Sequence, residues 1–239
     1  MSEARTLALI SSLYAAKDEA ELLAKMKAAA REIGYDQVLF GIELRLPVLG
    51  PLQHITSAYP EAYQVLYQER AFLTKDPTVV HCQTRTEPLI WREQMYDRAW
   101  QEMMEEARRF GLAHGVSLPV HEQGKIVSML SLGRDKPFES EAERDFILNA
   151  GNVLAHSLHF ASENLILPDL LEARRPHLSP REKECFQLAA QGKSNWDIGQ
   201  LLAISEAAAA FHVKNILKKL RVSTRMQAVA IGVALGMIT

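Results

Sequence analysis

Several side chains in the first half of the sequence combine large apolar rings with hydrogen-bonding groups. Together they could line a pocket for a small molecule, because each phenol, indole or hydroxyl brings one polar atom to an otherwise apolar wall. They lie close together, beside segments that we expect to form strands. These residues are Tyr59, Tyr63, Tyr67, Asp76, Thr78 and Trp91.

Each of these residues also has a simpler explanation. Aromatic side chains belong mostly to hydrophobic cores, and an aspartate before a proline commonly starts a turn or caps a helix. For Asp76, which precedes Pro77, helix capping is the favoured interpretation when the residue is taken alone.

No pattern typical of an enzyme accompanies this set. The sequence offers no nucleophile–base pair, no glycine-rich phosphate loop and no metal-ligand spacing. His81 and Cys82 are adjacent, but both fall in one predicted helix and no third member is evident. Cys82 and Cys185 are the only cysteines, and they are too far apart in sequence to indicate a pair. We therefore expect a binding protein with no catalytic residue, no metal and no cofactor.

The segments around this set predict an α+β domain. Alternating apolar residues indicate four strands: 37–46, a short strand through Ile55, 115–121 and 125–133. A turn at 122–124 joins the last two into a hairpin. Helices are expected around Leu7, Ile10, Leu13 and Tyr14, after a cap at Asp18, at about 60–71, 77–85 and 98–110, and after a cap at Ser140. Antiparallel strands with helices before and after them are typical of an α/β/α sandwich.

A second group of residues, near the C-terminus, could bind DNA. Ser205 is suited to cap a helix, and apolar residues then recur at helical spacing as one stripe. The opposite face holds Ala207, Ala210, Lys214 and Lys218. Small residues allow close approach to base edges in the major groove, and lysines can meet phosphates. The segment taken alone also fits an ordinary amphipathic helix with a solvated lysine face.

The neighbouring segments place this helix in a helix-turn-helix pattern. A short helix begins after Ser194, and only Ala203 and Ile204 separate it from the next cap. Upstream, Ser179-Pro180-Arg181-Glu182 combines a capping box with proline at the first helical position. Ser223 is expected to cap a last helix. Four short helices from about residue 178 to the end therefore predict an all-α domain.

Charge is distributed unevenly along the 239 residues. From Pro176 onward there are eight basic and four acidic residues, a formal charge of +4, so the total of −2 leaves −6 on the rest. A basic C-terminal module suits a polyanionic partner. No apolar run approaches the roughly 20 residues that cross a bilayer, and no signal-peptide core is present. We expect a cytoplasmic protein without membrane contact.

A long set of spaced residues in the C-terminal segment resembles the DNA-binding domain of LuxR-type transcription regulators. The set is Leu178-Ser179-Pro180-Arg181-Glu182-Lys183-Glu184, Gly192-Lys193-Ser194, Ile198, Ser205-Glu206, Phe211-His212-Val213 and Lys219-Leu220. The resemblance implies binding to double-stranded promoter DNA. The expected contacts are Lys193, Ser194, Asn195, Ala207, Ala210, Lys214, Lys218 and Lys219. The sequence departs from the family at Ala208-Ala209, where Thr-Val is usual, so a hydroxyl that would reach a phosphate is missing.

The order and spacing of the aromatic set resemble the signal-binding domain of LuxR-type receptors for N-acyl-homoserine lactones. The resemblance implies that Tyr59 and Ser131 donate to the amide carbonyl of the ligand and that Asp76 accepts its amide N–H. It further implies that Thr78 holds the Asp76 carboxylate, while Tyr67 and Trp91 wall the lactone ring. A buried amide that lost either partner would cost about 1–3 kcal/mol, so this pairing gives specificity as well as affinity.

One departure concerns Tyr63, where the family almost always has a tryptophan that donates to the lactone carbonyl. Gln64 also stands where some relatives have an arginine near a 3-oxo group. An alternative is therefore a LuxR-type regulator that responds to a non-lactone signal or to none. A phosphate-accepting response regulator is disfavoured, because the N-terminal half shows no strand–helix repeat with an acidic cluster.

These observations combine into one expected organisation. Residues 1–163 form an autoinducer-binding domain, residues 164–177 a linker, and residues 178–239 the helix-turn-helix domain. The ligand shifts the population towards a homodimer that presents two recognition helices about one turn of DNA apart. The sequence leaves open the acyl-chain length, the operator, and whether the bound protein activates or represses.

Overall fold

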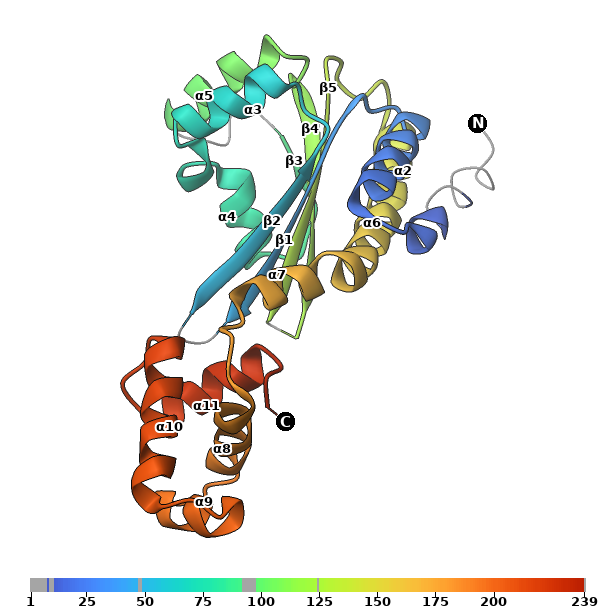
Figure 1. Cartoon of the computed structure of the whole chain (residues 1–239). Helices are drawn as coiled ribbons and strands as arrows, with labels where there is room; N and C mark the ends of the chain where they lie inside the picture. The colour runs from blue at the N-terminus through green and yellow to red at the C-terminus, as the bar shows by residue number, and fades with distance from the viewer. Residues whose placement is uncertain (1–7, 9–10, 47–48, 92–97, 124, 239) are drawn as a thin grey trace. The chain divides into compact units, whose positions relative to one another are not determined.

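The computed structural model describes residues 8, 11–46, 49–91, 98–123 and 125–238, which form two compact units. The first contains most of the sheet with its helices, and the second contains the C-terminal helices together with Arg45–Leu52 (Figure 1). In the part of the chain that the structure describes, every helix is too short or too polar to span a bilayer. The expected positions of Leu7, Ile10 and Gly124 lie outside the described residues.

A five-stranded sheet with the strand order β2-β1-β5-β4-β3 forms the centre of the first unit. The pairs β1–β5, β5–β4 and β4–β3 are antiparallel. The strands are β1 (Gln37–Leu46), β2 (Gly50–Ser57), β3 (Leu89–Ile90), β4 (His114–Glu122) and β5 (Ile126–Arg134). The expected strands are present, and β3 is additional, because two residues are too few to show a period of two.

Helices cover both faces of the sheet, which confirms the expected α/β/α sandwich (Figure 1). One face carries α2 (Glu19–Glu32) and α6 (Glu141–Leu165). The other carries α3 (Glu61–Glu69), α4 (Pro77–Thr84) and α5 (Arg98–Arg108). Two 3-10 helices are η1 (Leu13–Ala15) and η2 (Phe72–Thr74). Asp18 and Ser140 cap α2 and α6 as expected, each accepting a backbone N–H three residues on.

The alternation of side chains along β5 separates the two faces of the sheet. Met129 and Ser131 face the side covered by α3 to α5, whereas Leu132 is fully buried on the side of α6. There, Gly151 of α6 lies against Leu118 and Leu132, and a Cβ on it would come within 3.2 Å of Leu118. Because successive side chains of β5 point to opposite faces of the sheet, this strand contributes to the packed core beneath α6 on one face. On the other face it contributes to the side covered by α3 to α5.

Four helices make up most of the second unit: α8 (Pro180–Ala190), α9 (Asn195–Leu202), α10 (Glu206–Leu220) and α11 (Arg225–Ala234). Helix α10 packs against each of the other three. The buried side chains include Leu178, Cys185, Phe186, Ile198, Ala209, Ile216, Leu220 and Ile231. The expected all-α helix-turn-helix unit is confirmed. In addition, α7 (Leu167–Arg174) makes most of the segment 164–177 helical.

Helix caps define where these helices begin. Ser179, Ser194 and Ser205 cap α8, α9 and α10 as the sequence predicts. The cap expected at Ser223 is wrong by one residue, because the Thr224 side chain accepts the Gln227 N–H in a capping box. Ser–Thr offers two capping hydroxyls in succession, and only the glutamine three residues after Thr224 distinguishes them.

Candidate functional site

The side chains expected to bind a ligand meet around one cavity of about 480 Å³ in the first unit. The volume lies in the range typical of small-molecule sites, roughly 300–1,000 Å³. The sheet forms one wall, and α3, η2, α4 and α5 form the others. All seven expected residues line it: Tyr59, Tyr63, Tyr67, Asp76, Thr78, Trp91 and Ser131.

Local structure explains how residues distant in sequence reach this cavity. Tyr63 and Tyr67 are one turn apart on α3, so their rings share a face and lie 6.0 Å apart between centroids. Ser131 is placed by β5, opposite Leu39 of β1, which also lines the cavity. Asp76 and Thr78 come from the start of α4.

Asp76 caps α4 and lines the cavity at the same time, so the two interpretations of this residue are compatible. Its Oδ1 accepts from the Thr78 backbone N–H at 2.8 Å and from the Thr78 hydroxyl at 2.7 Å. Its Oδ2 accepts from the Tyr67 hydroxyl at 2.8 Å. Burial raises the pKa of the Asp76 carboxyl, while the hydrogen bonds from Thr78 and Tyr67 oppose that rise. The sequence did not reveal that Tyr67 donates to this carboxylate.

The Tyr59 hydroxyl is buried and makes no hydrogen bond of standard geometry among the described residues. Burial raises the pKa of this phenol well above its usual value, although the Ser131 side chain lies near enough to lower the pKa slightly, so the phenol remains a neutral donor. A buried donor left unsatisfied costs about 1–3 kcal/mol. Because Tyr59 lines the cavity, a ligand acceptor could satisfy it.

A chain of hydrogen bonds runs along the β4 side of the cavity. The Trp91 indole N–H donates to Ser117 Oγ at 2.9 Å, and Ser117 Oγ lies 2.8 Å from Ser131 Oγ. If Ser117 donates to Ser131, the Ser131 hydrogen is free to point elsewhere. The sequence reasoning did not identify Ser117, because the expected turn at 122–124 would pair it with Met129, whereas in the structure it pairs with Ser131. Gly115 gives the indole room, since a Cβ there would lie 2.5 Å from the Trp91 ring.

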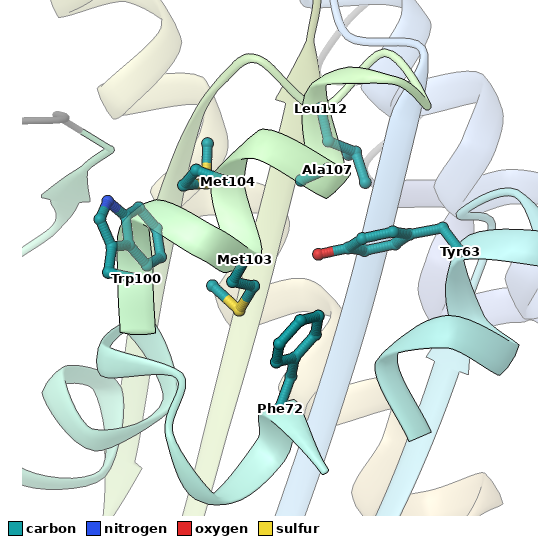
Figure 2. Packing of buried hydrophobic residues seen from close by; sticks show 7 residues of the cluster. All are labelled: Tyr63, Phe72, Trp100, Met103, Met104, Ala107 and Leu112. Atoms are coloured by element: carbon teal, nitrogen blue, oxygen red, sulfur yellow. The ribbon is translucent and has the colours of Figure 1, made fainter. Parts of the chain in front are cut away.

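An apolar cluster closes the cavity on the side of α5 (Figure 2). Figure 2 shows the Tyr63 ring pointing from α3 towards Met103 and Ala107. The Tyr63 side chain is only 4% exposed, and burial raises the pKa of its phenol. The cluster consists of Tyr63, Phe72, Trp100, Met103, Met104, Ala107 and Leu112. The sequence pointed to Tyr63 alone, because methionines on a helix carry no distinctive pattern.

Gln64 also lines the cavity, and its side chain is already engaged. Its Nε2 donates to the Tyr59 backbone carbonyl at 2.7 Å. This bond ties the first turn of α3 to the segment that carries the Tyr59 phenol.

The second unit presents the outer face that the sequence predicts for α10. Ala207, Lys214 and Lys218 are exposed and Ala210 is half-buried. On the opposite side of the helix, Ala209 and Ile216 are buried. Among the described residues, no ion pair involves Lys214 or Lys218.

The loop before α9 is held by an arginine that the sequence reasoning missed. Arg225 donates to the Lys193 carbonyl and to Asn195 Oδ1, both at 2.6 Å. Ser194 is occupied with its cap, accepting the Asp197 N–H at 3.1 Å and donating to Asp197 Oδ2 at 2.6 Å. The exposed Lys193 side chain is therefore carried on a fixed loop.

Lys219, another of the expected DNA contacts, forms an ion pair within the second unit. Its Nζ lies 2.6 Å from Glu182 Oε2, and Glu182 is only 4% exposed. Burial opposes the charge of Glu182, but hydrogen bonds from Lys219 and Ser179 outweigh it and lower the pKa of this carboxyl. Lys219 thus joins α10 to α8.

Two protein families match the chain in succession. Residues 18–161 match the family described as "Autoinducer binding domain", and residues 176–231 match "Bacterial regulatory proteins, luxR family".

Characterised relatives match almost the whole length. The chain is 32% identical over 227 residues to the transcriptional activator protein SolR of Ralstonia nicotianae, covering 95% of this chain and 96% of that protein. It is 30% identical over 230 residues to the HTH-type quorum-sensing regulator RhlR of Pseudomonas aeruginosa, covering 96% and 95%. The crystal structure of Escherichia coli SdiA has the same fold, with a TM-score of 0.73 at 24% identity over 99% of this chain and 98% of that one. The chain therefore belongs to the LuxR family of quorum-sensing transcription regulators, which pair an autoinducer-binding domain with a helix-turn-helix domain and are not enzymes.

Proposed function

We propose that this regulator binds an N-acyl-homoserine lactone in the cavity of its first unit. The observation that carries the proposal is the buried Tyr59 hydroxyl, which makes no hydrogen bond of standard geometry among the described residues and borders the same cavity as the Asp76 carboxylate. A donor and an acceptor on the wall of one apolar cavity are what a secondary amide requires.

The amide of the ligand would take both partners. Tyr59 donates to its carbonyl, with Ser131 as a second donor, and Asp76 accepts its N–H. Each carboxylate oxygen has two lone pairs, and Asp76 Oδ2 uses one of them for Tyr67. The other remains for the ligand, while Thr78 fixes the orientation of the carboxylate.

The lactone ring would lie among the aromatic side chains. Tyr67 and Trp91 wall it, and the Tyr63 hydroxyl supplies the donor that an indole supplies elsewhere in the family. The acyl chain has an apolar surface available at Leu39, Ile55 and Met129.

We further propose that the second unit binds double-stranded promoter DNA as part of a homodimer in the cytoplasm. Residues 1–163 would bind the lactone, 164–177 connect the two parts, and 178–239 bind DNA. Lys214 is the expected base or phosphate contact, with Lys193 and Lys218 on phosphates. Ala207 and Ala210 leave room for the groove. Two copies of α10, related by a two-fold axis, would meet successive major grooves about one helical turn apart.

The test is mass spectrometry of the organic extract from full-length protein expressed with a panel of lactones. A stoichiometric lactone in the extract, lost in Asp76→Asn, is the expected result. If no lactone co-purifies while another acyl compound does, the alternative holds: a LuxR-type regulator with a non-lactone signal. If nothing co-purifies, the regulator responds to no such ligand.

A further inference from the structure

Three side chains that could bind a metal ion meet on the sheet face that carries α6. Glu122 is the last residue of β4, and His159 and Glu163 are one turn apart on α6. One ligand atom from each lies within 4.8 Å of the other two. Glu122 and Glu163 are partly exposed, so an ion in solution has access. None of these residues lines the cavity described above.

His159 is held in a fixed orientation before any ion binds. Its side chain is 8% exposed, and its Nδ1 lies 2.6 Å from Ser128 Oγ on β5. Its Nε2 therefore points towards Glu122, whose Oε2 is 3.2 Å away. A histidine that binds a metal through one ring nitrogen commonly has the other fixed by such a hydrogen bond.

The surroundings of the cluster also suit a cation. Within the described ranges, no lysine or arginine pairs with either glutamate, so no such ion pair competes for the two carboxylates. An imidazole ligates a metal through a nitrogen that carries no proton, so Nε2 would release its proton when the ion binds and Nδ1 would then donate to Ser128 Oγ.

We propose that Glu122, His159 and Glu163 bind one divalent transition-metal ion of the Zn²⁺ class, with Ser128 positioning the imidazole. One imidazole with two carboxylates suits Zn²⁺ better than Mg²⁺ or Ca²⁺, which prefer all-oxygen sites. Water completes the coordination. The bound ion ties the β4–β5 hairpin to α6 and stabilises the first unit.

Zn²⁺ titration of chelator-treated full-length protein by calorimetry tests this site. Visible absorption with Co²⁺ as a spectroscopic probe reports coordination directly. We expect one saturable equivalent, a higher melting temperature, and at least tenfold weaker binding in Glu122→Gln and Glu163→Gln. His159→Gln should abolish the Co²⁺ spectrum. Ser128→Ala should weaken binding about tenfold, the lower end of what loss of such a partner costs.

His156 provides the matched control. It is exposed on the same helix, and its Nδ1 contacts only the Asn152 carbonyl among the described residues. His156→Gln should bind Zn²⁺ like the parent. If Glu122→Gln, Glu163→Gln and Ser128→Ala fold normally by circular dichroism yet bind Zn²⁺ like the parent, the ion sits adventitiously on surface groups and the proposal is wrong. Absence of a saturable equivalent overturns it as well.

Discussion

At the scale of single residues, Tyr63 stands where the resemblance to the family leads us to expect a tryptophan. A phenol hydroxyl extends along the ring axis, whereas an indole N–H leaves from the ring edge, so the two place a donor at different points. The buried Tyr63 ring points towards α5 and packs 5.5 Å from Phe110 between centroids. In the proposed binding mode, its hydroxyl would donate to the lactone carbonyl directly or through a bridging water.

We predict that Tyr63→Phe loses roughly 1–3 kcal/mol of lactone binding, because the carbonyl is left buried without a donor. Tyr63→Trp should retain or improve binding of ordinary homoserine lactones. Titration of both variants with one lactone series is the measurement. If Tyr63→Phe binds every lactone as tightly as the parent does, the Tyr63 hydroxyl makes no contact with the ligand and the ring only lines the cavity.

We predict that Asp76 makes lactone binding dependent on pH. The ligand N–H needs the ionised carboxylate, and burial raises the pKa of Asp76 in the free protein. Affinity for the lactone should therefore be full above this raised pKa and should fall as the pH drops through it. The fall should occur at a pH above the usual range for an aspartate carboxyl. Stability of the ligand-free protein has the opposite sign, because the folded state holds the Asp76 proton more tightly and loses that advantage as pH rises. The two trends are separated by measuring lactone dissociation constants across a pH series and melting curves of the ligand-free protein across the same series. An affinity that does not change on acidification contradicts the role of Asp76.

The residues of the cavity show how far sequence reasoning reaches. Aromatic side chains and an aspartate are recognisable because few surface segments combine them. The hydrogen bond from Tyr67 to Asp76 and the one from Trp91 to Ser117 could not be recognised in the same way. Both depend on side-chain rotamers and on tertiary packing. A serine in a strand looks the same whether it faces solvent or a buried indole.

At the scale of elements, the lysines of α10 have two different environments. Lys214 and Lys218 are exposed, whereas Lys219 pairs with Glu182 of α8. We predict that Lys218→Ala weakens binding to all DNA sequences alike and lowers the salt slope by about 1. Lys219→Ala should instead lower stability by on the order of 1 kcal/mol, since its partner Glu182 is buried but Lys219 itself is partly exposed. Binding at several salt concentrations and chemical denaturation distinguish the two; an unchanged salt slope in Lys218→Ala would falsify its role.

The same helix carries the Ala208-Ala209 departure. Ala208 is half-buried in the first turn of α10, whereas Ala209 is fully buried. We predict that Ala208→Thr tightens operator binding by restoring a hydroxyl that can reach a phosphate. Ala209→Val adds a branched side chain at a fully buried position and restores no hydroxyl, so it is the comparison variant for Ala208→Thr. If Ala208→Thr leaves affinity flat or lowers it in a gel-shift titration, α10 docks differently from its relatives.

Elements were predictable where local chemistry defines them. Caps at Ser179, Ser194 and Ser205 follow from side chains that accept backbone N–H groups within one turn. The two-residue β3 was not predictable, because its pairing with β4 comes from tertiary contact and not from a pattern in its own sequence.

At the scale of the whole molecule, ligand binding and folding stability are linked. A ligand that binds only the native state adds about 2.7 kcal/mol at 100 times its dissociation constant. We predict that the preferred lactone raises the melting temperature and that Asp76→Asn removes most of the rise, because an amide would face the ligand N–H with a donor. If no lactone raises the melting temperature, the non-lactone alternative leads.

Two domains and their classes could be predicted because each has its own periodicity and charge. The cavity could not, since its 480 Å³ is the space left between the methionines of α5 and the sheet. The size of this space depends on how α5 packs against the sheet, and the sequence of one segment alone does not determine that packing.

That space also governs how the first unit responds to hydrostatic pressure. Compression favours the state of smaller volume, and unfolding eliminates internal voids, so the volume change of unfolding scales with the void that is lost. The cavity of about 480 Å³ is partly open to solvent and has polar groups on its wall, so pressure can fill it with water. We expect a bound ligand to occupy that space and so to make the first unit less sensitive to pressure. We therefore expect the ligand-free protein to be the more compressible form.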